Sequence, residues 1–212
     1  MIKVVVFDFD GTLMDSEPIK QASWTDVFED DPHIGTDLIR DTLARNVGNR
    51  FDILRDILVR AGTPSDQIGS LINEYAARYD DIVQRGIAVK GLAAGAEEVI
   101  DALSSRHCLY INSGTPEPSL RATVENLGID RYFKAVLGAP PTKEENLGSI
   151  IGREGVDARE VVMIGDRDGD LHAARSCDTH FIGIANDLNQ WHTADFPVAA
   201  EIRGIDKIIG TL

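Results

Sequence analysis

The chain has 212 residues, of which 43% are hydrophobic, so it can bury a sizeable core and is expected to be globular. Its 21 Lys and Arg residues and 35 Asp and Glu residues give a formal net charge of −14, which argues against nucleic acid or an anionic membrane as a partner. A small anionic substrate stays compatible with this charge, because salt screens repulsion beyond about 8 Å. The chain opens on a strand-like segment, without a signal-peptide pattern or a membrane-spanning apolar run, so we expect a soluble cytoplasmic protein.

The first predicted strand is the apolar run Val4–Phe7, which leads into Asp8, Asp10 and Gly11. While the backbone stays extended, the two carboxylates share a face, because strand side chains alternate with period two. Two like charges about 4 Å apart cost about 4 kcal/mol at an effective dielectric of about 20, so a cation has to compensate them. Solvated turn carboxylates are the alternative, although a buried strand gains nothing structural from such an ending.

A block of predicted helices follows the first strand. Apolar residues recur at helical spacing through about residue 85. Gly62 ends one predicted helix, and the segment Thr63–Asp66 starts the next with a cap residue and a proline at the first helical position. We expect residues 16–86 to form a helical domain inserted into an α/β core made of residues 1–15 and 87–212.

The remainder of the chain alternates between predicted helices and predicted strands. This alternation favours an α/β fold with a doubly wound parallel sheet. In such sheets, ligands bind at the carboxyl ends of the strands. The predicted helices cover residues 97–105 and 117–127, and the predicted strands cover residues 109–111, 135–137, 161–164 and 181–184.

Polar residues also follow the second and fourth predicted strands. Ser113 and Gly114 come after the second strand, and Asp166 and Asp170 come after the fourth. The expected fold brings these strand ends next to the aspartates that follow the first strand. Such hard oxygen ligands, too few for a complete cage, indicate Mg²⁺, which keeps several waters and commonly binds through carboxylates together with substrate phosphate.

The motifs together resemble those of the haloacid dehalogenase superfamily. Residues 8–13, with the sequence Asp-Phe-Asp-Gly-Thr-Leu, resemble the family's first motif. Ser113 resembles the second motif, Lys143 the third, and residues 165–170, with a G-D-x-x-x-D pattern, the fourth. The helical block at residues 16–86 resembles the helical cap of the phosphoglycolate phosphatase and β-phosphoglucomutase-like subfamily. The resemblance covers nearly the whole chain and implies a Rossmann-like core.

The resemblance implies hydrolysis of a small phosphorylated metabolite. Asp8 would attack the phosphoryl group and form an aspartyl-phosphate. Asp10 would protonate the leaving alcohol and then take a proton from the hydrolytic water. Lys143, Ser113 and Gly114 would hold the phosphoryl oxygens and offset their charge.

The resemblance also implies a metal site and several rival activities. Mg²⁺ would be bound by the side chain of Asp8, the backbone carbonyl of Asp10 and the side chain of Asp166, with Asp170 in support. A sugar-phosphate mutase of the same family is the alternative to a phosphatase, and a non-catalytic phospholigand-binding module is a more distant one. A dehalogenase is disfavoured, because its metal-independent chemistry has no use for Asp10 or a magnesium site.

Structural roles are alternatives for several of these residues. Ser113 could cap the helix that starts near Pro116, and Lys143 could be an exposed lysine at a helix start. Asp168 is interpreted as a solvated residue of a turn or helix start and is left out of the site. Asn112 stands where the family more often has an apolar residue, so the second motif departs from the family's pattern there.

Three residues between two predicted cap helices are candidates for substrate specificity: Arg45, Asn49 and Arg50. They lie where similar proteins place a loop that reaches toward the catalytic aspartates. Because Arg can bind a carboxylate or a second phosphate in bidentate fashion, this segment suits an acidic or phosphorylated small molecule. The alternative is that all three are ordinary solvated residues at helix ends.

Overall fold

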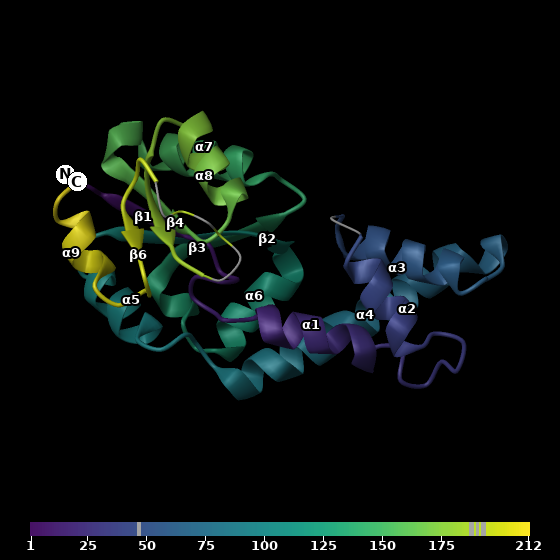
Figure 1. Cartoon of the computed structure of the whole chain (residues 1–212). Coiled ribbons are helices and arrows are strands. Elements are labelled where there is room, and N and C mark those ends of the chain that lie inside the picture. Colours follow the sequence, from purple (N-terminus) through teal and green to yellow (C-terminus); the bar gives the residue numbers. More distant parts are fainter. Residues whose placement is uncertain (46–47, 187–188, 190, 192–193) are drawn as a thin grey trace. The chain divides into compact units, whose positions relative to one another are not determined.

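The structure of the protein is a computed structural model (Figure 1). It describes residues 1–45, 48–186, 189, 191 and 194–212. The chain divides into two compact units, a larger unit made of Met1–Ser16 and Lys90–Leu212 and a smaller unit made of Glu17–Val89. None of the helices in the described stretches is long and apolar enough to cross a membrane.

A parallel sheet forms the centre of the larger unit. Its strands, within the described residues, are β1 (Val4–Phe7), β2 (Cys108–Pro116), β3 (Phe133–Ala139), β4 (Val161–Gly165), β5 (His180–Ile184) and β6 (Val198–Ala199). They lie in the order β3-β2-β1-β4-β5-β6, and Val4 of β1 pairs with Cys108 on one side and Val161 on the other. The chain thus builds the sheet outward from β1 in both directions, which confirms the predicted doubly wound α/β fold.

Helices cover both faces of this sheet. In the described part of the larger unit they are α5 (Ala96–Ser104), α6 (Glu117–Asn126), α7 (Lys143–Glu154), α8 (Asp168–Ser176), α9 (Ile205–Ile209) and the short 3-10 helices η1 (Asp130–Tyr132) and η2 (Ala158–Glu160). Val4 and Val6 belong to the core under α7 and α8, whereas α5, α6 and α9 lie on the other face (Figure 1). Every residue of β1 is fully buried, which explains its continuous apolar sequence.

Helix α7 matters for the site because Lys143 is its first residue. The Oγ1 of Thr142 accepts a hydrogen bond from the backbone N–H of Glu145 at 3.2 Å, and Oε2 of Glu145 accepts one from the N–H of Thr142 at 2.8 Å. This capping box satisfies two N–H groups that the helix start leaves unpaired. The helix ends at Gly155, whose φ of 62° is a conformation that favours glycine.

The smaller unit is helical. Its described helices are α1 (Glu17–Asp26), α2 (Thr36–Leu43), α3 (Arg50–Arg60) and α4 (Ser65–Lys90). Aromatic pairs join the start of this unit to its long helix: the rings of Trp24 and Tyr79 lie 4.5 Å apart, and those of Phe28 and Tyr75 lie 4.7 Å apart. Gly62 follows α3 with a φ of 80°, so this helix ends where glycine was expected to end it.

The core strands extend beyond some of their predicted bounds. The strand expected at residues 109–111 runs from Cys108 to Pro116, because its pairing with β3 resumes after an irregular stretch, with Pro116 opposite Ala139. Ser113 and Gly114 therefore lie within β2 and not after it. Strand β6 and helix α9 were not predicted, since elements of two and five residues are too short to leave a periodic pattern.

Candidate active site

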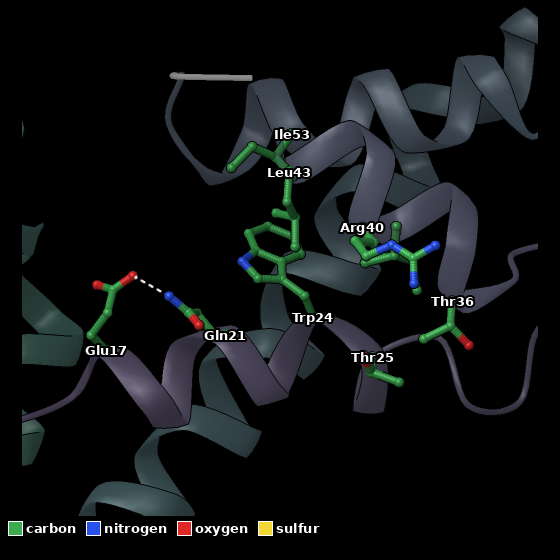
Figure 2. A pocket seen from close by; sticks show the side chains of 9 residues that line it. Glu17, Gln21, Trp24, Thr25, Thr36, Arg40, Leu43 and Ile53 are labelled. Atoms are coloured by element: carbon green, nitrogen blue, oxygen red, sulfur yellow. Dashed lines mark hydrogen bonds between the residues drawn. The ribbon is translucent and has the colours of Figure 1, made fainter. Parts of the chain in front are cut away.

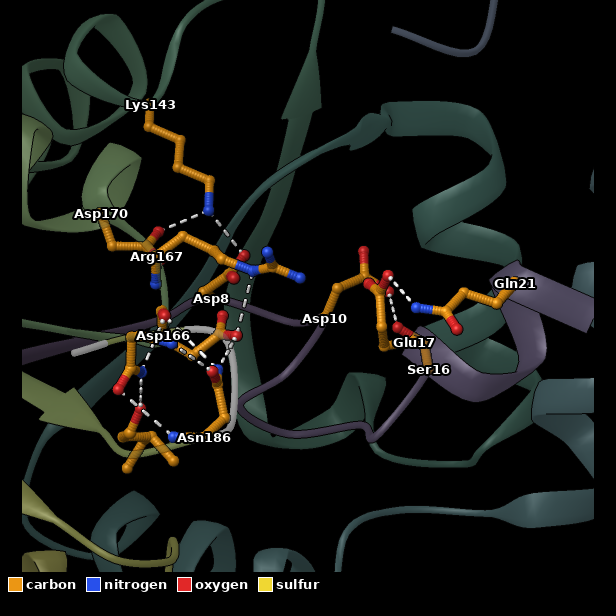
Figure 3. A network of polar contacts seen from close by, with 12 residues as sticks. Asp8, Asp10, Ser16, Glu17, Gln21, Lys143, Asp166, Arg167, Asp170 and Asn186 are labelled. Carbon is orange, nitrogen blue, oxygen red and sulfur yellow. Dashed lines mark hydrogen bonds and ion pairs between the residues drawn. The ribbon is translucent and has the colours of Figure 1, made fainter. Parts of the chain in front are cut away.

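Three aspartates meet at the carboxyl ends of the neighbouring strands β1 and β4. Asp8 follows β1 and Asp166 follows β4, and the backbone N–H of Asp8 donates to the carbonyl of Ile164 at 2.8 Å, so the two strand ends lie side by side. Asp170 joins them from the first turn of α8. One carboxylate oxygen of each aspartate lies within 4.8 Å of the others, and all three residues are buried (Figure 3).

The ammonium of Lys143 lies between two of these carboxylates. Its Nζ is 2.8 Å from Oδ1 of Asp8 and 2.5 Å from Oδ1 of Asp170 (Figure 3). The lysine side chain is only 17% exposed, which excludes the alternative of a solvated surface lysine. Since the buried carboxylates outnumber this ammonium, the cluster keeps a net negative charge when all its members are ionised.

Burial changes the proton affinity of every member of this cluster. Burial raises the pKa of Asp8 to about 7, with Asp170 adding to the effect and Lys143 opposing it. Burial and the charge of Asp8 raise the pKa of Asp166 to about 6, and burial also raises the pKa of Asp170. Burial alone would lower the pKa of Lys143, but Asp8 and Asp170 together raise it. The aspartates therefore hold protons more tightly than ordinary carboxyls do.

The cluster fits a hard divalent cation. Oδ1 of Asp166 is buried and accepts no hydrogen bond from the residues that the structure describes, whereas the buried Oδ1 of Asp8 lies 2.8 Å from the ammonium of Lys143. A buried carboxylate oxygen without a donor, in a site with surplus negative charge, is what a Mg²⁺ ion would satisfy. Asp170 differs, because its Oδ1 accepts from Lys143 at 2.5 Å and its Oδ2 accepts from the N–H of Arg167 at 3.0 Å. Asp8 and Asp166 are thus the better ligands.

Gly11 lets the turn after β1 pass directly against Asp166. A Cβ atom at Gly11 would lie 2.1 Å from Oδ2 of Asp166, and the φ of Gly11 is +82°. Both the contact and the backbone conformation require glycine. The backbone of the turn that carries Asp10 is thereby held close to the carboxylate of the fourth strand.

Two asparagines after β5 hold Asp166 in place. Nδ2 of Asn186 donates to Oδ2 of Asp166 at 2.7 Å, and Nδ2 of Asn189 donates to its backbone carbonyl at 3.2 Å. The backbone N–H of Asn189 in turn donates to Oδ1 of Asn186 at 3.0 Å. The half-exposed side chain of Arg167 also forms an ion pair with this carboxylate, with its Nε 3.3 Å from Oδ2 of Asp166. Neither asparagine was predicted from the sequence, although their position after a core strand was a signal that could have indicated them.

Asp10 lies outside the three-aspartate cluster. The chain turns at Phe9, whose carbonyl accepts hydrogen bonds from Leu13 N at 3.0 Å and Met14 N at 3.0 Å, so the extended backbone does not continue to Asp10. The Oγ of Ser16 donates to Oδ1 of Asp10 at 2.5 Å, and the Oγ1 of Thr115 donates to its Oδ2 at 2.7 Å. Figure 3 shows this carboxylate directed toward Ser16 and away from Asp8. The shared face expected for an extended backbone therefore does not apply to this turn.

Ser113 and Gly114 lie on β2, beside β1. Ser113 is buried, and its Oγ accepts a hydrogen bond from the backbone N–H of Thr115 at 3.1 Å. It does not cap α6, because that helix has Pro116 at its N-cap position and no side-chain cap bond. Gly114 is exposed, and a Cβ atom there would meet nothing within 4 Å.

The three specificity candidates of the smaller unit have different surroundings. Asn49 caps α3, since its Oδ1 accepts from the N–H of Phe51 at 2.9 Å. Arg50 forms an ion pair with Asp80 of α4, and its side chain is only 14% exposed. Arg45 follows α2 and is exposed. The structure thus gives two of the three a role in holding the smaller unit together.

A substitution at Asn49 separates the cap role from a role in binding. Asn49→Ala is expected to lower the free energy of unfolding by about 1 kcal/mol, because the first N–H groups of α3 lose their acceptor, and Asn49→Ser is expected to restore it. Urea denaturation of both variants, together with their enzyme kinetics, measures this. A serine variant as stable as the wild type that still binds substrate poorly would contradict a purely structural role.

The smaller unit also contains a pocket of about 550 Å³ (Figure 2). Trp24, Ile39 and Leu43 provide apolar walls, while Gln21 and Arg40 provide polar groups. This volume and this mixture of surfaces fall within the range of small-molecule sites.

The structure thus combines a doubly wound parallel sheet, buried aspartates after β1 and β4, and a lysine whose ammonium lies between Asp8 and Asp170. Residues 2–178 match the haloacid dehalogenase-like hydrolase family, and the chain belongs to this family. The resemblance stated from the four motifs is thereby confirmed, and the protein is a hydrolase.

Curated relatives cover most of the chain. A phosphoglycolate phosphatase of Vibrio parahaemolyticus is 28% identical over 202 residues, which are 89% of this chain and 86% of that protein. A 5'-nucleotidase of Pseudomonas aeruginosa is 29% identical over 190 residues, with 85% of this chain and 81% of that protein covered. Both names are those of enzymes that act on phosphorylated small molecules.

Solved structures share the fold. A Thermotoga maritima protein assigned provisionally as a β-phosphoglucomutase superposes with a TM-score of 0.78 at 20% identity, covering 100% of both chains. A 2-haloacid dehalogenase from Pseudomonas syringae superposes with a TM-score of 0.67 at 21% identity, covering 100% of this chain and 99% of that one. Because different activities appear among these neighbours, the shared fold does not choose between them.

Proposed function

We propose that this protein is a Mg²⁺-dependent phosphomonoesterase that hydrolyses a small phosphorylated metabolite through an aspartyl-phosphate on Asp8. The observation that carries the proposal is the buried cluster of Asp8, Asp166, Asp170 and Lys143, in which Oδ1 of Asp166 accepts no hydrogen bond from any described residue. A dehalogenase would need neither a metal site nor a second acid at Asp10. The names of the curated relatives, a phosphoglycolate phosphatase and a 5'-nucleotidase, agree with this proposal.

The proposed reaction uses two carboxylates in sequence. A carboxylate oxygen of Asp8 attacks phosphorus, and the bond from phosphorus to the leaving oxygen breaks while Asp10 gives that oxygen a proton. Water then attacks the aspartyl-phosphate and passes a proton to Asp10. This step releases inorganic phosphate and restores the Asp8 carboxylate and the protonated Asp10. For the first step Asp10 must carry a proton and lie near the leaving oxygen, and its hydroxyl partners Ser16 and Thr115 hold it away from Asp8 in this conformation.

The remaining roles follow from charge and position. Lys143, Ser113 and the backbone of Gly114 bind the phosphoryl oxygens, and the lysine also keeps the pKa of Asp8 from rising further. The side chains of Asp8 and Asp166 and the carbonyl of Asp10 would hold Mg²⁺, with Asp170 in support. When bound, the ion neutralises the negative charge of the carboxylates and of the phosphoryl group.

For the substrate, we propose an acidic phosphorylated metabolite, with phosphoglycolate as the first compound to test. We also propose that residues 16–86 are a cap domain inserted into a core made of residues 1–15 and 87–212, and that Arg45, an exposed cation of this domain, binds a second anionic group of the substrate. This assignment agrees with the names of several curated relatives.

The proposal is tested by measuring phosphate release from a panel of compounds in Mg²⁺ and in EDTA. The panel contains phosphoglycolate, nucleoside 5'-monophosphates and hexose phosphates. We expect metal-dependent release from at least one of them, with Asp8→Asn inactive. If no compound is hydrolysed, or if EDTA has no effect, the proposed function is wrong.

A sugar-phosphate mutase is the second candidate, because the same cluster would serve it and a neighbour of the same fold is assigned that activity. A mutase would retain a phosphorylated Asp8 against water and release the phosphoryl group only to a sugar phosphate. Trapping the phosphoenzyme and following its decay with and without glucose 1-phosphate distinguishes the two. A non-catalytic phospholigand-binding module would instead keep its function in Asp8→Asn.

A further inference from the structure

Asn112 is a buried amide in an apolar part of the sheet. It lies on β2, is 0% exposed, and follows Tyr110 by two residues, so both side chains point to the face that α7 covers. An amide costs free energy to bury unless it is hydrogen-bonded. A valine or leucine would cost less free energy to bury at this position, so the polar contacts of Asn112 need an explanation.

Both ends of the Asn112 side chain are bonded to helix α7. Its Nδ2 donates to the backbone carbonyl of Lys143 at 2.8 Å, and its Oδ1 accepts from Nδ2 of Asn146 at 3.1 Å. Asn146 is itself only 6% exposed. The two amides therefore join the end of a core strand to the first turn of the helix, and one bond goes to the residue whose ammonium contacts Asp8.

The amide link and the N-terminal cap of α7 fix different features of the helix. The capping box of Thr142 and Glu145 fixes the local conformation of the helix start, and both of these residues belong to the helix side. Asn112 belongs to the sheet, beside the strand that carries Asp8. The distance from Asn112 to the carbonyl of Lys143 therefore fixes where the helix start lies relative to β2, and hence how far the lysine side chain reaches.

We propose that the amide pair Asn112–Asn146 is a positioning device that sets the ammonium of Lys143 between Asp8 and Asp170. The proposal rests on the proposed function, in which Lys143 binds the phosphoryl group. Stability alone does not require the pair, because replacing both partners of a buried hydrogen bond by apolar groups of similar shape is close to neutral. The device should therefore show itself in phosphate binding and turnover more than in folding.

The test is the double variant Asn112→Leu/Asn146→Leu, which leaves no buried amide without a partner. We expect kcat/KM to fall by about 10- to 100-fold, because a shift of about 1 Å in a catalytic group can cost that much. Inhibition by inorganic phosphate should weaken by about tenfold, since the ammonium that binds it has moved. The thermal midpoint should stay within a few degrees of the wild type, and Mg²⁺ should still raise it.

Tyr110→Phe is the matched control. Tyr110 lies on the same strand and the same face, and its hydroxyl bonds Glu154 at the far end of the same helix. This variant loses a buried link between β2 and α7 without touching the helix start, so its kcat/KM and phosphate inhibition should change by a factor of about two or less. An equal loss in both variants would mean that any weakening of the strand–helix contact lowers activity, and would overturn the proposal.

A cycle with Lys143→Met tests whether the pair acts through the lysine. In the Lys143→Met background, the two leucine substitutions should change the residual affinity for phosphate by a factor of about two or less. This affinity is measured from the thermal shift that inorganic phosphate produces in the presence of Mg²⁺. If the leucine substitutions lower phosphate affinity as much in the Lys143→Met background as in the wild type, the proposal is overturned. If the double variant does not fold, Asn112→Thr replaces it, because threonine suits a strand but is too short to bond both partners. Failure of the proposed function would look different, since the wild type itself would then hydrolyse nothing or Asp8→Asn would stay active.

Discussion

Asp8→Asn is expected to lower kcat by about 10⁴-fold or more, since the loss of a catalytic nucleophile has an effect of this order. A neutral amide oxygen cannot form the acyl phosphate that the proposed reaction requires. The substitution is nearly isosteric and removes one of the mutually repelling charges of the cluster, so the metal-free variant should be at least as stable as the metal-free wild type. Initial rates with the best substrate of the panel, and thermal melts, measure both effects.

Asp168→Asn is the control for this experiment. Asp168 belongs to the same sequence motif as Asp166 and Asp170, but it is exposed at the start of α8. Its substitution is expected to change kcat/KM by a factor of about two or less, as is usual for surface positions. If Asp8→Asn keeps more than about a tenth of the wild-type rate, Asp8 is not the nucleophile. If Asp168→Asn is equally inactive, the loss cannot be assigned to the buried cluster.

The sheet could be predicted from the sequence because its central strands are buried on both faces. The uninterrupted apolar residues of Val4–Phe7 and Val161–Gly165 have this origin, and their polar endings marked where the strands stop. The same reasoning failed at β2, which continues to Pro116. That extension depends on pairing with β3, a long-range contact that leaves no local pattern.

The charged residues of the candidate site could be predicted from the sequence. Asp8, Asp166, Asp170 and Lys143 are all titratable groups in unusual surroundings, and the fold brings them together. Neutral amides carry no such signal. Asn112 was noted only as a departure from a motif, and its contact with Lys143 spans 31 residues of sequence, so only the folded chain displays it.

The turn at Asp10 shows the limit of period-two reasoning. The alternation of side chains holds only while the backbone stays extended, and here β1 ends at Phe7 and a turn closed by hydrogen bonds to the carbonyl of Phe9 follows Asp8. The two carboxylates separate into different environments as a result. Asp8 is enclosed by the acidic cluster, while Asp10 is bonded by the hydroxyls of Ser16 and Thr115. Two carboxylates with different partners suit two different chemical roles.

Mg²⁺ is expected to stabilise the protein strongly near neutral pH and little in mild acid. In the metal-free protein, burial raises the pKa of Asp8 to about 7 and that of Asp166 to about 6, from an ordinary value of 3.8. Between the ordinary and the raised values, the folded state holds protons that the unfolded state has released. These two groups therefore favour folding at low pH, and their contribution is lost as the pH rises through 6 and 7.

Mg²⁺ reverses this dependence, because it binds only the ionised carboxylates and competes with protons for them. At about 100 times its dissociation constant the ion should raise the thermal midpoint by about 5 to 10 °C near neutral pH, and by little near pH 5, where the aspartates are protonated. Thermal melts with Mg²⁺ and with EDTA at both pH values measure this. An equal shift at both pH values would contradict a carboxylate site with raised pKa values.

Asp166→Asn provides the decisive comparison, because it removes a metal ligand and a repelling charge together. Without Mg²⁺ near neutral pH, this variant should melt at a higher temperature than the wild type, since the remaining carboxylates of Asp8 and Asp170 face one negative charge fewer. With Mg²⁺ it should gain almost nothing, whereas Asp168→Asn should respond as the wild type does. A metal response that survives in Asp166→Asn would place the ion elsewhere. If the metal-free Asp166→Asn variant is less stable than the metal-free wild type, the hydrogen bond that Asn186 donates to Asp166 stabilises the protein more than the charge of Asp166 destabilises it.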